Sequence, residues 1–91
     1  MINLSEFLKN KREASGLSQK DVAKKLGYTS PQFISNWERG ISNPPLPKVK
    51  RLADLYKIPH DEIYNVMLNY TIQVATEDLK AQFYGRKRKS H

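Results

Sequence analysis

Cysteine is absent from this 91-residue chain, and histidine occurs only twice, at His60 and His91. The chain therefore has no disulfide bond and no thiolate ligand for a metal ion. None of its four glycines belongs to a glycine-rich phosphate loop, and its acidic residues and histidines lack the spacing of a metal site. We therefore expect no enzymatic activity, no cofactor and no bound metal.

Long apolar runs are also missing. No segment approaches the ~20 apolar residues that span a bilayer, and the N-terminus lacks the apolar core of a signal peptide. A chain without disulfide bonds is expected to be intracellular by default. These absences predict a cytoplasmic protein with no membrane partner. The short chain has enough residues for one small helical bundle but not for a large enzyme cleft.

Positive charge is in excess, with 16 basic and 9 acidic residues and a net charge of +7. Such a balance suits a polyanionic partner such as nucleic acid. Four positive charges form the run Arg86 to Lys89, which we expect to lie in a basic disordered tail over residues 86–91. The tail has two possible roles. It binds DNA by following the phosphates or entering a minor groove, or it only keeps the chain end soluble.

The spacing of apolar residues predicts helices over residues 4–15, 19–26, 31–39, 46–56 and 60–70. Residues with capping side chains stand before the first three of these helices: Asn3, Ser18 and Ser30. A glycine follows each of the same three: Gly16, Gly27 and Gly40. Pro31 suits the first position of the third helix, and a proline-rich connection precedes the fourth. The fourth helix has an apolar side made of Leu46, Val49, Leu52, Ala53 and Tyr56. The pattern predicts an all-α fold of five helices with a C-terminal extension.

Residues after position 69 follow a different pattern. Ile72 and Val74 alternate with polar residues, which predicts a short strand. Thr76, followed by two acidic residues, indicates a further helix start, with the helix reaching about Tyr84. We therefore divide the chain into a domain over residues 1–69, an extension over 70–85 and the tail over 86–91. The apolar side chains of the extension either bind a partner protein, close a homodimer or cover the domain's own core.

The third predicted helix has two chemically different sides at about 100° per residue. Its inward side is apolar and consists of Ile34, Trp37 and Ile41. Its outward side carries Gln32, Asn36 and Arg39, flanked by Phe33 and Ser35. Glutamine and asparagine present a donor and an acceptor that match adenine N6 and N7 in the major groove, and arginine pairs with guanine or phosphate. The alternative is an ordinary solvated surface.

The segment GLSQKDVAKKLGYTSPQFISNWERG, followed by PPLPKVKRLADLYKI, resembles the phage repressor/Cro-type helix-turn-helix family, also called the xenobiotic-response-element family. The resemblance covers about residues 4–68. It implies a five-helix, repressor-like helix-turn-helix bundle that binds double-stranded DNA as a homodimer. One departure is a turn between Gly27 and Ile34 that is one residue longer than the family pattern.

The resemblance also implies roles for single residues. Gln19 is implied to contact a phosphate, although a first-turn glutamine with no such role is the alternative. Arg39, Ser42 and Asn43 lie where the family contacts the DNA backbone. Together with the hydroxyl-bearing and outward residues, they give the predicted DNA-binding set: Ser18, Gln19, Thr29, Ser30, Gln32, Phe33, Ser35, Asn36, Arg39, Ser42 and Asn43.

Three side chains have structural interpretations beside functional ones. Phe33 either packs on Tyr28 or touches a thymine methyl group. Ser18 and Ser30 are helix caps whether or not they contact phosphate. The resemblance further implies a partly buried ion pair between Arg12 and Glu38 that braces the motif.

These observations predict a sequence-specific DNA-binding transcriptional regulator, which represses from a palindromic operator as a homodimer with its third helix in the major groove. The alternative is an antitoxin-type protein that binds a partner protein through the extension and regulates its own operon. RNA binding is disfavoured because no stacking platform of aromatic residues on a sheet is apparent.

Overall fold

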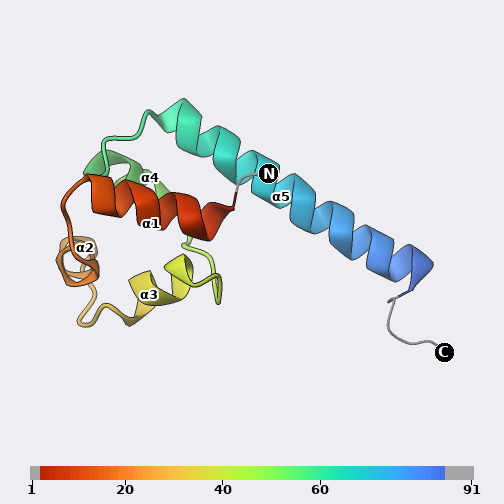
Figure 1. The fold of residues 1–91 in the computed structure, drawn as a ribbon, viewed down its shortest axis with the longest axis horizontal. Coiled ribbons are helices and arrows are strands. Elements are labelled where there is room, and N and C mark those ends of the chain that lie inside the picture. The colour runs from red at the N-terminus through yellow and green to blue at the C-terminus, as the bar shows by residue number, and fades with distance from the viewer. Residues whose placement is uncertain (1–2, 86–91) are drawn as a thin grey trace.

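The computed structural model describes residues 3–85, and this part of the chain contains five α-helices and no strand. The helices are α1 (Leu4–Ala14), α2 (Gln19–Leu26), α3 (Gln32–Glu38), α4 (Leu46–Leu55) and α5 (His60–Tyr84) (Figure 1). The predicted all-α class is confirmed. The tail over residues 86–91 lies outside the described residues. None of the described helices is long and apolar enough to cross a membrane.

Local capping fixes the starts of α1 and α2. The Asn3 Oδ1 atom accepts a hydrogen bond from the backbone N–H of Glu6 at 3.2 Å. Ser18 and Asp21 form a reciprocal pair, in which each side chain accepts from the other's backbone N–H at 2.9 Å. Both helix starts agree with the prediction, because each requires only residues within one turn of the chain.

Helix α3 begins one residue later than predicted, with Pro31 at its cap position. The Ser30 hydroxyl is 3.4 Å from the backbone N of Gln32, so it is a weak substitute for a cap. At the other end, Gly40 has φ +75° and the N–H of Ile41 donates to the Asn36 carbonyl at 2.9 Å. This is the helix stop that glycine favours.

The early stop of α3 corrects the prediction for Ile41, which is 58% exposed rather than buried. The helical period no longer applies to Ile41, because it lies past the end of the helix. Leu46 was also expected on an apolar inner side and is 65% exposed. Leu46 is the first residue of α4, and the buried residues of that helix begin one turn later, at Val49.

The hydrophobic core lies among all five helices. Helix α1 packs against α3 and α5, α2 packs against α3 and α4, and α4 packs against α5. The buried apolar residues are Leu4, Leu8, Val22, Ala23, Leu26, Ile34, Trp37, Val49, Leu52, Ala53, Tyr56, Ile58, Ile63 and Val66. Since Val66 is the last of them, only the first part of α5 belongs to the core.

Helix α5 is continuous over 25 residues, which corresponds to ~37 Å. Its second half projects from the bundle (Figure 1). The radius of gyration is accordingly 15.4 Å, compared with ~12 Å for a compact chain of this length.

The continuous α5 shows that the predicted strand at Ile72–Val74 and the predicted new helix start at Thr76 were wrong. The Thr76 hydroxyl donates to the Ile72 carbonyl at 2.7 Å, within the helix. Extending an existing helix costs less free energy than starting a new element, so a short alternation of apolar residues does not interrupt it. The helix also crosses the boundary predicted after residue 69.

Candidate nucleic-acid interface

Helix α3 is held by its inward side and presents its outward side to solvent. Ile34 and Trp37 are 1% and 3% exposed and insert into the core. Gln32 and Phe33 are exposed, and Asn36 is half-buried. The two sides derived from the helical period are therefore present, and the outward polar side chains sit on a helix that the core positions.

Gln32 and Asn36, one turn apart on α3, contact one another. The Gln32 Nε2 atom donates to the Asn36 Oδ1 atom at 2.9 Å. This hydrogen bond leaves the Gln32 carbonyl oxygen as an acceptor and the Asn36 amide nitrogen as a donor. An acceptor beside a donor is the pattern that the major-groove edge of adenine complements.

Aromatic residues brace the turn between α2 and α3. The rings of Tyr28 and Phe33 lie 4.7 Å apart, and Tyr28 meets Trp37 edge-on at 6.0 Å. Phe33 thus makes the packing contact considered from the sequence, while 52% of it stays exposed. The exposed part leaves the contact with a thymine methyl group as a prediction. Lys48 Nζ lies 5.2 Å from the centre of the Tyr28 ring.

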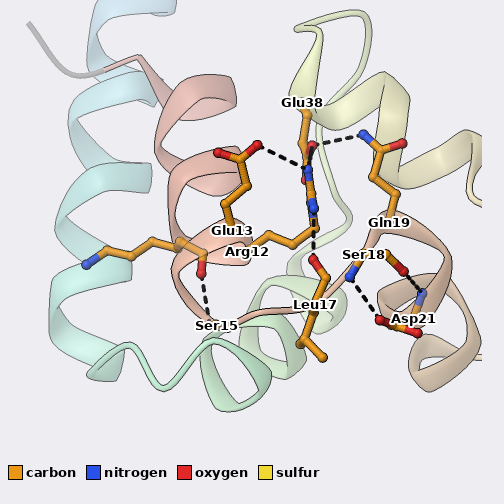
Figure 2. A network of polar contacts seen from close by, with 9 residues as sticks. Arg12, Glu13, Ser15, Leu17, Ser18, Gln19, Asp21 and Glu38 are labelled. Atoms are coloured by element: carbon orange, nitrogen blue, oxygen red, sulfur yellow. Dashed lines mark hydrogen bonds and ion pairs between the residues drawn. The ribbon is translucent and has the colours of Figure 1, made fainter.

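A polar network joins α1, α2 and α3 behind the exposed side (Figure 2). Arg12 donates to Glu38 through Nε at 2.6 Å and through Nη2 at 3.0 Å, and its Nη1 atom donates to the Leu17 carbonyl at 2.8 Å. Only 10% of the Arg12 side chain and 3% of the Glu38 side chain are exposed. The hydrogen bonds to Glu38 raise the pKa of Arg12 above its ordinary value. The direct contact expected from the resemblance is therefore present.

Gln19 belongs to this network, which the sequence did not indicate. Its Nε2 atom donates to Glu38 at 2.9 Å, and the residue is half-buried (Figure 2). The hydrogen bond links the first turn of α2 to the last turn of α3. Contact of Gln19 with a phosphate stays a prediction. The observed bond to Glu38 also gives Gln19 a structural role, because it holds α2 against α3.

The start of α2, the turn after it and α3 carry four exposed or half-buried candidates with hydroxyl groups. Ser18 is exposed, and its hydroxyl caps α2. The hydrogen bond from the backbone N–H of Ser18 to the Asp21 carboxylate is the main cause of the lowered pKa of Asp21. Thr29 and Ser30 are exposed, and Ser35 is half-buried on α3. These positions agree with an outward role for the hydroxyl groups, and contact of these groups with DNA stays a prediction.

Two lysines next to these hydroxyl groups were missing from the predicted set. Lys20 and Lys24 line an open depression together with Thr29 and Ser30. Both lysines are exposed on α2. Their spacing of four residues on a helix was the signal available in the sequence, since it places them on one side. An amine and a hydroxyl group in one depression suit a phosphate.

The loop after α3 carries the remaining candidates. Arg39, Ser42 and Asn43 are exposed. The Asn43 Nδ2 atom donates to the Tyr70 hydroxyl at 3.3 Å, so the loop is linked to α5. The eleven predicted residues thus lie at the first turn of α2, in the following turn, along α3 and in the loop after α3.

Comparison with known proteins identifies this arrangement of helices. The family model described as helix-turn-helix matches residues 8–63. The chain belongs to the Cro/C1-type helix-turn-helix family. It is similar to the HTH-type transcriptional regulator ImmR of Bacillus subtilis (strain 168), with 29% identity over 89 residues. That alignment covers 87% of this chain and 69% of ImmR. No solved structure matches.

The matched range contains both helices of the helix-turn-helix motif, α2 and α3, with the Arg12–Glu38 pair that joins α1 to α3. Membership makes the chain a DNA-binding regulator of transcription, in a family of DNA-binding proteins rather than of enzymes. The family inferred from the sequence is confirmed.

Proposed function

We propose that the chain is a sequence-specific transcriptional repressor that binds a palindromic operator as a homodimer, with α3 in the major groove. The observation that carries the proposal is the hydrogen-bonded pair Gln32 and Asn36 on the outward side of α3. The backbone of α3 is held in place by Ile34 and Trp37, which are buried on the opposite side of the helix. A reading pair on a rigid support loses little conformational entropy when it binds.

The pair reads bases through the two groups that its own hydrogen bond leaves free. The Gln32 carbonyl oxygen accepts from an adenine N6 amine, and the Asn36 amide donates to an adjacent N7 or carbonyl acceptor. Phe33 adds an apolar contact with a thymine methyl group. Together these contacts favour A·T pairs near the centre of each half-site.

Phosphate contacts on both sides of α3 set the position of the helix in the groove. The first turn of α2 directs backbone N–H groups toward one strand, where Ser18, Lys20 and Lys24 add side-chain donors. Arg39, Ser42 and Asn43 contact the backbone beyond the other end of α3. These contacts carry no sequence information, but they account for salt-dependent affinity.

Selection of bound sites from random double-stranded DNA tests the proposal. We expect an enriched inverted repeat whose half-sites are separated by about one helical turn, ~34 Å. The exposed variant Lys50→Ala on α4, outside the predicted set, is a matched control that should select the same repeat. Absence of any enriched sequence would reject sequence-specific binding, and an enriched single half-site would reject the homodimer.

A second candidate function follows from the exposed apolar side chains in the second half of α5. In the antitoxin-type alternative, this helix binds a different protein. Purification of the chain from its host distinguishes the two. Co-purification of a second protein in stoichiometric amount, lost when Ile72 is replaced by aspartate, would favour the antitoxin. Purification of the chain without any second protein would favour the repressor.

A further inference from the structure

The projecting half of α5 has an apolar stripe that nothing in the described chain covers. The stripe consists of Leu68, Ile72, Ala75, Leu79 and Phe83. The four large side chains in it are 41%, 55%, 66% and 76% exposed, in chain order. The stripe lies opposite the side of α5 on which Ile63 and Val66 enter the core, since α-helical geometry turns ~100° per residue.

The spacing of the stripe is that of a helix that pairs with another helix. Leu68, Ile72, Ala75 and Leu79 follow one another at intervals of four, three and four residues. Alternating intervals of this kind form the seam of a two-stranded coiled coil. Monomeric proteins rarely expose so many adjacent apolar side chains, and such surfaces mark interaction sites.

We propose that this stripe pairs with the same stripe of a second copy of the chain, with the two α5 helices antiparallel. This inference rests on the homodimer of the proposed function and specifies its interface. In the register that matches the seams, Leu68 lies beside the partner's Leu79 and Ile72 lies beside the partner's Ala75. Two-fold symmetry repeats both contacts, and the small Ala75 lets the helices approach closely near the axis.

Charge selects the antiparallel arrangement. Helix α5 begins with Asp61 and Glu62, and the helical period places Asp61 on the same side of α5 as the stripe. Antiparallel pairing keeps the acidic starts of the two helices apart and opposes the two helix dipoles. Parallel pairing would align the dipoles and bring Asp61 next to its own copy.

The size of the stripe suits a dimer that DNA binding reinforces. Four large side chains at these exposures bury on the order of 1,000 Å² over both copies, which lies at the lower limit for a specific interface. Two half-sites that hold the copies side by side raise their effective concentration, so DNA binding strengthens a dimer with an interface of this size.

Disulfide cross-linking tests the arrangement, because the chain has no native cysteine. Leu68→Cys and Leu79→Cys variants are oxidised separately and as a mixture. In the antiparallel register, two copies of position 79 lie ~16 Å apart along the axis, beyond the ~7 Å limit for a disulfide. We expect at least about tenfold more mixed disulfide than Leu79→Cys homodisulfide. Glu77→Cys, exposed on the opposite side of α5, sets the background from collisions.

Two results would overturn the proposal. A dominant Leu79→Cys homodisulfide would show parallel pairing, and no cross-linking above the Glu77→Cys background would show that the stripe does not pair with itself. Sedimentation equilibrium adds a readout without cysteine: Ile72→Asp should weaken dimerisation at least about tenfold, and an unchanged dimer would contradict the proposal. If the pairing of the α5 stripes is disproved but the wild-type chain still selects an inverted repeat from random DNA, the proposed function stands and only the interface is wrong.

Discussion

Leu52 in α4 and Leu79 in α5 are the same residue type in the same secondary structure, yet they are 1% and 66% exposed. Around Leu52, apolar side chains enter a shared core and buried polar side chains have partners. Around Leu79, a regular helix continues past the core with its apolar stripe uncovered. The core side chains up to Val66 pack against one another, whereas the large side chains of the stripe, Leu68, Ile72, Leu79 and Phe83, are left exposed by the described residues.

The largest expected difference comes from truncating these two leucines. Leu52→Ala should lower the free energy of unfolding by about 4 kcal/mol, because it removes buried contacts and leaves a cavity. Leu79→Ala should change the free energy of unfolding of the monomer by less than about 0.5 kcal/mol. Urea unfolding at concentrations that keep the chain monomeric measures both. Similar losses for the two variants would mean that α5 is packed along its whole length.

Two ion pairs provide the next contrast. Arg12 and Glu38 are almost buried, whereas Lys11 and Glu62 are 3.6 Å apart with 37% and 45% of their side chains exposed. Glu38→Ala should cost about 3 kcal/mol of unfolding free energy, because it leaves the Arg12 charge buried without its partner. Glu62→Ala, the matched control, should cost less than about 1 kcal/mol.

Denaturant unfolding of both glutamate variants at low and high salt measures this contrast. The loss for Glu38→Ala should persist at high salt, since a buried pair is poorly screened, and the small loss for Glu62→Ala should disappear. Equal losses for the two variants would refute a bracing role for the Arg12–Glu38 pair.

Replacing a lysine by glycine should have opposite signs in the two regions. Lys57, just after α4, has φ +56°, a left-handed conformation that costs a side-chain-bearing residue about 1 kcal/mol. Lys57→Gly should therefore raise the free energy of unfolding by roughly 0.5 kcal/mol, after the extra entropy of glycine in the unfolded chain is counted. Lys80→Gly, inside α5, should lower helix stability by about 0.7 kcal/mol. Thermal unfolding followed by circular dichroism measures both changes. A destabilising Lys57→Gly or a stabilising Lys80→Gly would contradict the prediction.

The smallest effect concerns alkaline pH. Burial raises the pKa of Tyr56 above its ordinary value, so the folded state keeps the proton at a pH where the unfolded chain, with a tyrosine pKa of ~10, releases it. The resulting stability is fully present below pH ~10 and is lost as the pH rises toward the pKa of the folded state. Tyr56→Phe should lose less stability between pH 9 and 11 than wild type.

The exposed ring of Tyr84 supplies the control for the alkaline experiment. Tyr84→Phe should follow the wild-type dependence on pH, measured by guanidinium unfolding at each pH. If Tyr56→Phe also followed the wild-type curve, proton release from buried Tyr56 would not be the cause of the alkaline loss.

Features set by neighbouring residues were predictable from the sequence. The caps at Asn3 and Ser18 and the stop at Gly40 depend on residues within one turn, and all three are present. The two sides of α3 followed from helical period alone. The Arg12–Glu38 contact, which joins residues 26 positions apart, came from the family resemblance rather than from spacing.

Features set by distant residues or by the extent of a helix were not predictable. Ile41 was placed by a period that had already ended, and Ile72–Val74 was read as a strand because a three-residue alternation contains no information on the helix preceding it. The bond from Gln19 to Glu38 depends on how α2 meets α3, which one sequence does not encode locally. The sequence thus predicted the two sides of α3, and the resemblance predicted the Arg12–Glu38 pair, but the bond from Gln19 that completes the network was missed.

Binding of wild type and Asn36→Ala to the selected operator, and to operators with one base pair changed at a time, tests the central claim most directly. The claim is that the outward side of α3 reads bases. It predicts that Asn36→Ala loses discrimination at one position in each half-site, by about 1–3 kcal/mol. It also predicts unchanged affinity for random DNA. A uniform loss of affinity for every sequence, with discrimination intact at all positions, would contradict the account.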